Sequence, residues 1–481
     1  MKPQLFQDKE LGCIGSEAAF LGFRRANPER RASYLGNIDL QAVPGSLFPV
    51  ILEPTVGVLT ECVKRGLPEL AFWHGGHLLD IREEAPFAAL AEKRLKERDY
   101  PALKELNLLH IVSEILLKKT KMRSLPCHIQ LEHTSFCNAR CIMCDHYIAH
   151  NRGAKHLALS SVRRLEPVLP YVQLIVLHGN GEPLLNPEIM PLMQTYASYG
   201  VKISLNTNLS ILNDDILTML RSNCQSLHVS CDGCTAEQYE SIRLGLKFQT
   251  LLEHLNKLEQ DAPEINKVLE VVLMRRNVAS AVDFVNFASE HGFRSVRFNR
   301  LGVNEWIGNR KEADLGPMAL STLNAAKERG QLLGITVVTP SDASLCAGSD
   351  RSGGTSPQTV YDAAHSEKLH RYYPQYTNTI GCTLLPDSLL TEGRPLQPHC
   401  GLCEYPFAKT YIDLAGNVSI CCPASRMPVG RISDEQPFSA IWNGPQYQIL
   451  RRRFYEGNLP RLCETCFLLD TGSLQFLSDG G

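Results

Sequence analysis

The chain has 481 residues, of which 44% are hydrophobic and 21% charged, and this length allows roughly three domains with apolar cores. Its 49 Lys and Arg nearly balance its 51 Asp and Glu, so the summed charge gives no reason to expect a nucleic-acid or membrane partner. The opening MKPQLFQDKELG carries charges where a secretion signal needs an apolar core, and no apolar run reaches the roughly 18 residues of a membrane span. We therefore expect a cytoplasmic protein whose 17 cysteines serve metal binding rather than a disulfide framework.

We place the first domain at residues 1–125, which match no known motif. Two stretches, 87–99 and 102–119, have helical character, and we therefore expect an α-rich domain. Its expected role is either substrate recognition or a structural cap on the domain that follows.

Three cysteines follow the strand-like segment CHIQLEHTSF, with the spacing C-x3-C-x2-C: Cys137, Cys141 and Cys144. Thiolates suit iron–sulfur clusters and zinc, and structural zinc usually takes four protein ligands. Three cysteines leave one position open, at which a substrate or cofactor can bind. The alternative interpretation is that these are unrelated cysteines or part of a zinc site.

This loop resembles the signature of the radical S-adenosylmethionine (SAM) superfamily, C-x3-C-x-Φ-C, in which the apolar or aromatic Φ is Met143 here. The resemblance implies a [4Fe-4S] cluster on the three cysteines, with SAM chelated by the remaining iron. In that superfamily an electron from the cluster cleaves SAM to methionine and a 5'-deoxyadenosyl radical, which abstracts hydrogen from a substrate C–H bond. It also implies an electron donor such as flavodoxin or ferredoxin.

Strand-like and helix-like segments alternate through residues 126–340, which we expect to form the core domain. Such alternation predicts a parallel sheet with crossover helices. Six strand segments match the partial (β/α)6 barrel of the superfamily, whose chemistry lies at the carboxyl ends of the strands. The six segments are 127–136, 171–187, 201–210, 226–233, 268–277 and 295–302.

The turn after the second strand, Gly179-Asn180-Gly181-Glu182-Pro183, resembles the Gly-Gly-Glu-Pro motif of the superfamily, with Asn180 in place of a glycine. The resemblance implies that Glu182 accepts hydrogen bonds from the SAM ammonium group. Gly181 would let the backbone approach a ligand closely.

Later strand ends carry further residues that resemble SAM contacts of the superfamily. Ser230 is implied to contact the ribose or carboxylate of SAM, Arg243 to pair with its carboxylate, and Asn277 to contact its ribose. Thr207 and Asn277 equally suit a role in a cap or turn. The full set is Thr207 and Asn208 (with Leu209 where glycine is usual), Ser230, Asp232 before Gly233, Arg243, and Asn277.

Residues 341–399 are rich in Ser, Gly, Pro and Thr, and we interpret them as a linker or insertion. In the next segment, 400–470, Cys403, Gly416 and Cys421 reproduce the C-x9–15-G-x4-C opening of the SPASM domain, an auxiliary-cluster module of many radical SAM enzymes. TYIDLAGNVSI predicts a β-hairpin that brings the two cysteines together.

Cys463 and Cys466 resemble the next cysteine pair of that module, and the tail 471–481 adds none. The resemblance implies one auxiliary [4Fe-4S] cluster on Cys403, Cys421, Cys463 and Cys466. Zinc is the alternative, because 400/403 and 463/466 are paired C-x2-C knuckles, and Cys400 and Cys422 remain spare candidate ligands. The basic run at 451–453 is interpreted as a solvated helix face.

Together these patterns favour a radical SAM enzyme. The resemblance to SPASM proteins suggests a peptide substrate undergoing maturation, or a sugar-like or cyclitol-like metabolite that is dehydrogenated or epimerised. The second hypothesis is a non-catalytic iron–sulfur or zinc protein. Glu182, Ser230 and Arg243 discriminate between the two, since an electron carrier has no use for SAM-facing residues.

Overall fold

The computed structural model describes most of the core domain and parts of both flanking regions. The described residues are 4–8, 12–15, 32–37, 50–52, 70–74, 77–144, 153–301, 309–340, 390–391, 393–395, 403–422 and 427–463.

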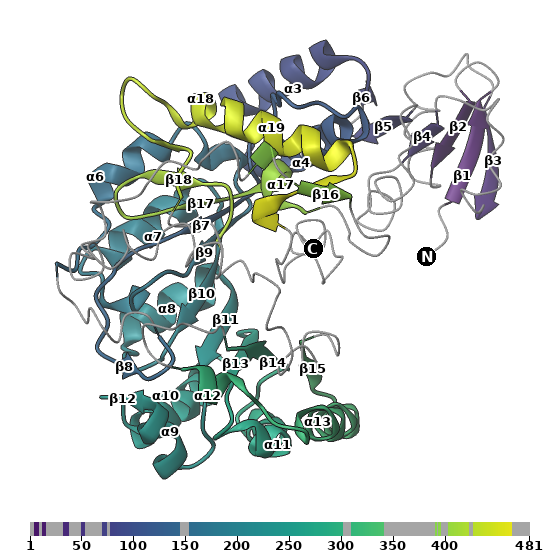
Figure 1. The fold of residues 1–481 in the computed structure, drawn as a ribbon. Coiled ribbons are helices and arrows are strands. Elements are labelled where there is room, and N and C mark those ends of the chain that lie inside the picture. The colour runs from purple at the N-terminus through teal and green to yellow at the C-terminus, as the bar shows by residue number, and fades with distance from the viewer. Residues whose placement is uncertain are drawn as a thin grey trace.

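The largest sheet has ten strands in the order β15-β14-β13-β11-β10-β9-β7-β17-β18-β19. Neighbours from β15 to β7 all run parallel, which confirms the expected parallel barrel sheet. Figure 1 shows these strands following an open arc. The six predicted strands are β7 (His128–Leu131), β9 (Leu174–Leu177), β10 (Lys202–Thr207), β11 (Cys224–Ser230), β13 (Lys267–Leu273) and β14 (Ser295–Arg300), and β15 (Thr336–Val338) adds a seventh.

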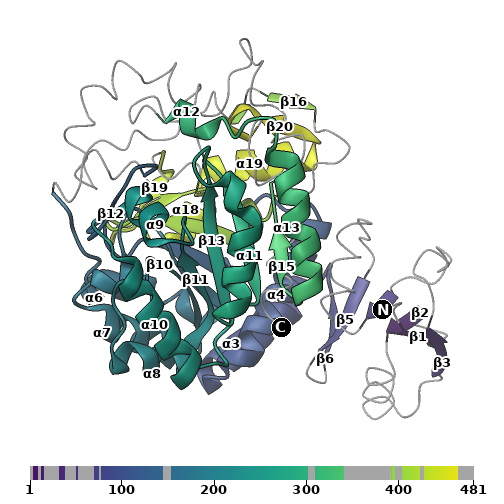
Figure 2. The same cartoon turned by 90° about the horizontal axis from the view of Figure 1, so that it is seen from below.

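Helices connect the strands and cover the outer face of the arc (Figure 2). Their apolar residues recur at helical spacing, as at Phe248, Leu251, Leu255 and Leu258 of α10, all of which are buried. Side chains also fix helix starts: Asn213 accepts a hydrogen bond from the backbone N–H of Ile216 at 2.9 Å. The helices are α6 (Leu159–Val162), α7 (Ile189–Ser198), α8 (Asp214–Asn223), α9 (Ala236–Ile242), α10 (Phe248–Asp261), α11 (Ala281–Glu290), α12 (Arg310–Ala313) and α13 (Ala319–Leu333).

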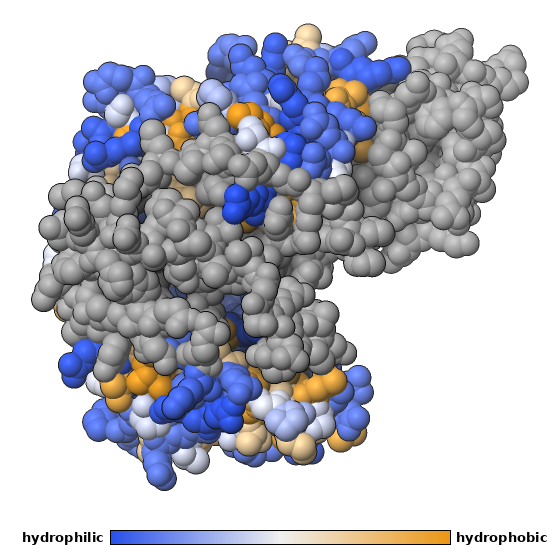
Figure 3. Space-filling model, in the orientation of Figure 1, coloured by the Kyte–Doolittle hydropathy of each residue, from blue (hydrophilic) through white to orange (hydrophobic). Residues whose placement is uncertain are grey.

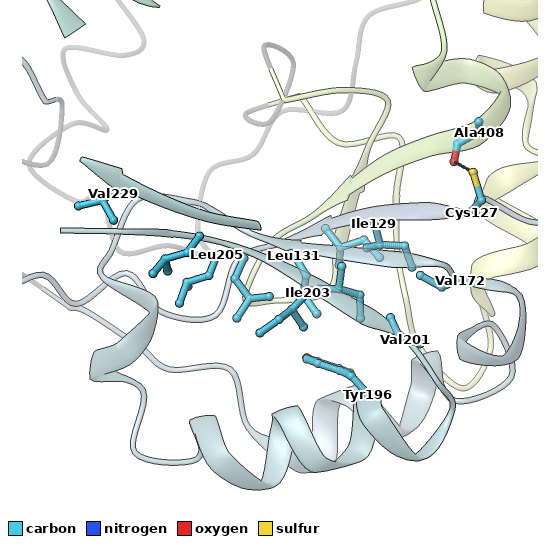
Figure 4. Packing of buried hydrophobic residues seen from close by; sticks show 14 of the residues in the cluster. Cys127, Ile129, Leu131, Val172, Tyr196, Val201, Ile203, Leu205, Val229 and Ala408 are labelled. Carbon is cyan, nitrogen blue, oxygen red and sulfur yellow. Dashed lines mark hydrogen bonds between the residues drawn. The ribbon is translucent and has the colours of Figure 1, made fainter. Parts of the chain in front are cut away.

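Alternation along β7, β10 and β11 separates an apolar outer face from a largely polar inner face. Figure 4 shows Ile129, Leu131 and Ile203 on the side of the sheet nearest Tyr196 of α7. These side chains are fully buried in the main hydrophobic core. The residues between them, such as Ser204, therefore face the concave side of the arc.

The C-terminal region continues the barrel sheet, a connection that the sequence did not reveal. Strand β17 (Lys409–Ile412) pairs parallel with β7, and β18 (Asn417–Ser419) folds back on it, confirming the predicted hairpin. Gly416 has φ +79° in its turn, and Asp413 Oδ1 accepts the backbone N–H groups of Ala415 and Asn417 at 2.8 and 2.9 Å. The remaining elements are α17 (Tyr405–Ala408), β19 (Gly430–Arg431), α18 (Phe438–Trp442), α19 (Pro445–Tyr455), and β20 (Asn458–Pro460), which pairs with β16 (Gly393–Pro395).

Arg451 of α19 ties the C-terminal region to the chain that precedes the barrel. It is fully buried, and it donates to Pro406 O at 2.7 Å and to Thr120 O at 2.9 Å. Its guanidinium lies 4.6 Å from the centre of the Trp442 ring. The prediction of a solvated face at 451–453 is therefore wrong for Arg451, because one residue of the run points inward while Arg452 is exposed.

The prediction of an α-rich N-terminal domain is also wrong in part. The described strands before residue 81 form a six-stranded sheet in the order β3-β1-β2-β4-β5-β6, which Figure 1 shows beside the barrel. These strands have only three to six residues each and lie between Gly-rich and Pro-rich stretches, so their sequence signal is weak. The clearer helical periodicity of residues 87–119 therefore determined the prediction. The strands are β1 (Gln4–Asp8), β2 (Gly12–Gly15), β3 (Ala32–Asn37), β4 (Val50–Leu52), β5 (Leu70–His74) and β6 (His77–Asp80).

The two expected helices of this region do form, as α3 (Glu84–Glu97) and α4 (Tyr100–Leu116). Helix α4 packs on the barrel, where Lys104 Nζ donates to the carbonyl oxygens of Tyr199 and Gly200, at 2.9 and 2.5 Å. None of the described helices is long and apolar enough to cross a membrane. The described surface in Figure 3 is largely hydrophilic, with apolar residues dispersed among the polar ones.

Candidate active site

The three-cysteine loop is fixed to the segment that follows α9. Strand β8 (Arg140–Cys141) pairs antiparallel with β12 (Arg243–Leu244), and Cys141 lies opposite Arg243. The Ile142 N–H donates to Ile242 O at 3.0 Å, which extends this pairing. Arg243 Nη1 lies 3.9 Å from Cys141 Sγ. The pairing therefore brings a permanent positive charge beside the cysteines.

The environment of the thiols fits a cationic iron cluster. Cys137, Cys141 and Cys144 are all half-buried. Burial raises the pKa of Cys137 to about 12 and also raises the pKa of Cys141, while Arg243 acts in the opposite direction on both. Buried thiols of this kind become thiolate ligands when a metal supplies compensating charge. Within the described ranges, no three His, Cys, Asp or Glu side chains converge closely enough to hold a single metal ion.

Gly181 allows the turn after β9 to lie directly against the start of the cysteine loop. A Cβ atom on Gly181 would lie 2.4 Å from Thr134 O and 2.6 Å from Phe136 O, which no side chain could tolerate without movement of the backbone. The neighbouring Glu182 N–H donates to Phe136 O at 2.8 Å. We expected Gly181 to let the backbone approach a ligand closely, and in the structure it approaches the backbone of Thr134 and Phe136.

Glu182 links this turn to the end of the next strand. Its Oε1 accepts from Thr207 Oγ1 at 2.7 Å and from the Leu184 N–H at 3.3 Å, and its Oε2 accepts from the Asn208 N–H at 2.7 Å. Asn208 Nδ2 in turn donates to Asn138 Oδ1 in the cysteine loop at 3.0 Å. The structure therefore brings Glu182, Thr207 and Asn208 together beside the cysteines.

Leu209 occupies a position that favours glycine. Its φ is +51°, in the left-handed region that β-carbon sterics disfavour, and its side chain is fully buried. The Thr207 hydroxyl accepts the Leu209 N–H at 2.9 Å, and His254 Nδ1 donates to Leu209 O at 2.8 Å. These bonds hold the backbone in the turn that the superfamily usually makes with glycine.

Asp232 and Arg243 form a buried ion pair at 2.7 Å, with side chains 0% and 8% exposed. Asp232 Oδ1 also accepts the Val272 N–H at 2.7 Å. Arg243 Nε is buried without a hydrogen-bond partner, so the guanidinium keeps one unmatched donor beside the cysteine loop. An anionic ligand group would match it.

Both polar groups of the Asn277 side chain are bonded to the protein backbone. Its side chain is wholly buried, and Nδ2 donates to the carbonyl oxygens of Asp232 and Val272 at 3.2 and 2.9 Å. Its Oδ1 accepts the Met274 N–H at 2.7 Å. This amide organises the strand ends, so the structural role that the sequence left open describes it better than a ribose contact.

The other sequence-identified residues occupy three kinds of position. Pro183 begins a short 3-10 turn and is buried. Met143 packs against the small apolar cluster of Ile242, Met274 and Leu301. Ser230 ends β11 in register with Glu270 of β13, on the concave face of the sheet.

Three of the four expected auxiliary ligands are described. Cys403, Cys421 and Cys463 are half-buried and pack against the main core, while Cys466 and the spare Cys400 lie outside the described residues. Cys422 points toward the barrel strands, where Gln130 Nε2 donates to its sulfur at 3.5 Å.

Tyr405 lies among these cysteines. Burial raises the pKa of Tyr405, and the neighbouring Cys422 and Cys421 thiols raise it further. The Tyr405 hydroxyl donates to Gln130 Oε1 at 3.3 Å. Gln130 of β7 therefore connects the C-terminal cysteines with the inside of the barrel.

Glu132 was missed by the sequence analysis, and it explains the unusual Asn180. Both the backbone N–H and the side-chain amide of Asn180 donate to Glu132 Oε1 at 2.9 Å. Burial raises the pKa of Glu132 to about 7. The sequence hinted at this contact only through Asn180, which replaces the usual glycine. Its amide bonds to the buried Glu132 carboxyl, which lies between the barrel and the C-terminal hairpin.

Two family models match the chain. Residues 131–294 match the radical SAM superfamily, and residues 403–467 match SPASM, an iron–sulfur cluster-binding domain. The mycofactocin maturase MftC of Mycobacterium ulcerans is 25% identical over 191 residues, covering 38% of this chain and 50% of that protein. The GTP 3',8-cyclase of Listeria welshimeri is 23% identical over 191 residues, covering 38% of this chain and 56% of that protein.

The chain thus spans about half the length of these curated relatives. Among solved structures, SuiB of Streptococcus suis bound to S-adenosylmethionine resembles this chain with a TM-score of 0.50 at 13% identity. The match covers 76% of this chain and 78% of SuiB. At this identity the likeness shows the fold alone.

Proposed function

Because this chain belongs to the radical SAM superfamily and carries a C-terminal SPASM domain, we propose that it modifies a peptide by radical chemistry. Radical SAM domains bind a [4Fe-4S] cluster together with SAM. SPASM domains bind auxiliary iron–sulfur clusters. When bound, the first cluster supplies the electron that cleaves SAM and so produces the hydrogen-abstracting radical. The protein supplies the positioning.

Cys137, Cys141 and Cys144 are the residues that we propose hold the SAM-binding cluster. The observation that carries this assignment is their convergence with Glu182, Thr207 and Asn208 at the carboxyl ends of parallel strands. Catalytic groups of α/β barrels lie at this edge. Arg243 compensates the negative charge that three thiolates add.

Glu182 and Arg243 are proposed to orient SAM. The Glu182 carboxylate already accepts three hydrogen bonds, and a carboxylate offers about four acceptor sites, so one remains for an ammonium donor. Arg243 has its unmatched Nε for a carboxylate group. Ser230 faces the same concave side from the end of β11.

The auxiliary cluster is proposed to bind Cys403, Cys421, Cys463 and Cys466, with zinc as the alternative. Gln130 contacts both Cys422 and Tyr405, and these contacts support an auxiliary site beside the barrel interior, where a substrate would lie. We further propose a cytoplasmic location and reduction by a flavodoxin or ferredoxin, because cleavage of SAM requires an external electron.

A peptide is the proposed substrate because the maturases among the relatives act, by name, in maturation. The GTP 3',8-cyclases favour the second candidate, a small metabolite, since similar chains can take a nucleotide. A mass-shift experiment distinguishes them. The chain is co-expressed with any short peptide that is encoded beside its gene, and each such peptide is analysed by mass spectrometry.

A peptide mass change that disappears with Cys141→Ala would support the proposal. An enzyme that cleaves SAM but leaves every such peptide unchanged would contradict the peptide assignment and turn the search to metabolites. Deuterium transferred from labelled peptide into 5'-deoxyadenosine would identify the residue that loses hydrogen.

A further inference from the structure

Part of the concave face, across β10, β11, β13 and β14, carries polar side chains where barrels usually hold bulky branched ones. Ser226 and His228 of β11 lie on this face, because Leu227 and Val229 between them are fully buried against the outer helices. Glu270 of β13 and Asn299 of β14 face the same side. A polar interior that contacts no outer helix calls for an explanation other than packing.

These side chains form one hydrogen-bonded chain across four strands. His228 Nδ1 lies 2.7 Å from Glu270 Oε1, and Asn299 Nδ2 donates to Glu270 Oε2 at 2.5 Å. Ser226 Oγ lies 3.0 Å from His228 Nε2, and Ser204 Oγ lies 2.8 Å from Ser226 Oγ. Each residue in this series therefore has a partner in the series within hydrogen-bond distance.

The charge of Glu270 fixes the direction of these bonds. Burial raises the pKa of Glu270, but bonds and charge interactions with His228, Arg297 and Asn299 outweigh it and lower the pKa overall. An ionised carboxylate only accepts, so the His228 Nδ1–H donates to it. In a neutral imidazole Nε2 is then the acceptor, and Ser226 donates to it. Glu270 thus sets the tautomer that a general base needs.

The network lies next to the proposed SAM position. His228 precedes Ser230 by two residues on the same face of β11, a separation of about 6.6 Å along a strand. Glu270 is the direct register partner of Ser230. The side chains of His228 and Glu270 are 12% and 11% exposed, and that of Arg297 beside them is 44% exposed. The described residues therefore leave this part of the interior partly open to solvent.

We propose that His228 is the proton acceptor for the substrate group that lies in the barrel interior, with Glu270 as its positioning residue. The inference rests on the proposed radical function. Its substrate class is a carbon that bears a hydroxyl or thiol, because hydrogen abstraction from such a carbon makes the attached O–H or S–H far more acidic.

The step moves one proton and no electron. The O–H or S–H bond of the substrate breaks as its proton passes to Ser226 Oγ. Ser226 simultaneously gives its own proton to His228 Nε2, so the hydroxyl is restored. The imidazolium that forms is stabilised by the Glu270 carboxylate at 2.7 Å.

Access to His228 can be tested without a substrate. The full chain with reconstituted clusters is treated with diethyl pyrocarbonate, and each histidine is followed by peptide mass spectrometry. His128 and His133, each 1% exposed, serve as internal controls. We expect His228 to react at least about tenfold faster than either. Reaction as slow as theirs would overturn the proposal, since the Ser226–His228 pair would then be closed to any group in the barrel interior.

The decisive experiment uses the peptide that the wild-type chain modifies and measures the ratio of modified peptide to 5'-deoxyadenosine. For His228→Ala we expect this ratio to fall about 100-fold, the usual contribution of a general base. Added imidazole should restore part of it, which a purely structural histidine would not allow. Ser226→Ala should lower the ratio by a similar factor, because the proton passes through this hydroxyl. Glu270→Gln should lower it by a smaller factor, and His77→Ala, at an exposed position, should leave it unchanged.

A His228→Ala variant with the wild-type ratio, or with an equal loss that imidazole does not rescue, would overturn the proton-acceptor role. Failure of the proposed function looks different. In that case the wild-type chain itself yields no modified peptide, and the inference loses its substrate together with the function.

Discussion

The two cysteine regions of this chain are built on opposite principles. The loop at 137–144 stands at the ends of parallel strands and is surrounded by bonds from separate segments, such as Asn208 to Asn138. The C-terminal cysteines instead flank a hairpin that extends the barrel sheet through β17. The first arrangement orients a ligand from several sides, whereas the second attaches a module rigidly to an existing strand. If the proposed assignment holds, the contrast teaches that a site that starts radical chemistry needs groups from several segments, while an auxiliary centre needs only a fixed position.

The largest expected effect separates the two regions by their metal content. After anaerobic reconstitution we expect about eight irons in the wild-type chain, and about four when Cys137, Cys141 and Cys144 are all replaced by alanine. Replacing Cys403 and Cys421 should also remove about four irons, but it should leave the SAM-binding cluster. Iron, sulfide and zinc are measured together.

A wild-type chain with about four irons and one zinc would still support a radical SAM enzyme, but it would show that the C-terminal cysteines bind zinc and not an auxiliary cluster. The absence of any iron–sulfur cluster at 137–144 would contradict both.

The attachment of the C-terminal module is tested by Arg451→Ala. The change removes a buried guanidinium and leaves the Pro406 and Thr120 carbonyls without their donor. We expect a loss of about 4 kcal/mol in the free energy of unfolding, measured by urea titration of tryptophan fluorescence. Arg452→Ala, on the exposed side of the same helix, should cost less than about 0.5 kcal/mol. Equal effects would show that Arg451 makes no special attachment.

The convergence at the first region is tested by Gly181→Ala. The added Cβ would collide with Thr134 O at 2.4 Å and push the turn away from the cysteine loop. We expect SAM cleavage to fall roughly 10-fold to 100-fold, because a displacement near 1 Å at a reacting site has that consequence. Gly316→Ala is the control for backbone strain alone, since nothing lies within 4 Å of its Cβ position but its φ of +79° disfavours a side chain, and it should leave SAM cleavage unchanged. Unchanged cleavage in Gly181→Ala would show that the turn does not set the geometry.

The last prediction concerns Glu132, which lies between the two regions and acts on stability alone. Burial raises the pKa of Glu132 from 4.5 to about 7 in the folded chain. The folded chain therefore binds this proton more tightly than the unfolded chain, and stability falls as pH rises from 4.5 to 7. The contribution is on the order of 3 kcal/mol across that window.

Thermal midpoints at a series of pH values check this prediction. Glu132→Gln should lose less stability than the wild-type chain as pH rises through the window, since the amide has no proton to release. A parallel decline in both proteins would assign the pH dependence to other groups.

Much of this could be predicted from the sequence, because its strongest signals are local. The spacing of Cys137, Cys141 and Cys144 is a local pattern, and so are the apolar runs of the six barrel strands and the turn residues of the hairpin. The side chains of Glu182 and Asn208 were identified by their order along the chain. The bonds that Glu182 accepts from the Asn208 N–H and from the Thr207 hydroxyl confirm that these strand ends meet.

What could not be predicted depends on pairing between distant segments. The junction of β17 with β7 joins strands that lie far apart in the sequence, and neither strand carries a mark of its partner. The inward direction of Arg451 within a basic run is decided by tertiary packing alone. The Ser226–His228–Glu270 network is likewise invisible, since it arises from the register of neighbouring strands rather than from any motif.

The central claim is that the loop at 137–144 initiates radical chemistry, and formation of 5'-deoxyadenosine tests it most directly. The reconstituted chain is incubated anaerobically with SAM and dithionite, and the products are quantified by liquid chromatography and mass spectrometry. The account predicts equal amounts of 5'-deoxyadenosine and methionine from the wild-type chain, the same products from Cys403→Ala, and none from Cys141→Ala. Formation of 5'-deoxyadenosine by Cys141→Ala at the wild-type rate, or none from a wild-type chain with its iron in place, would contradict it.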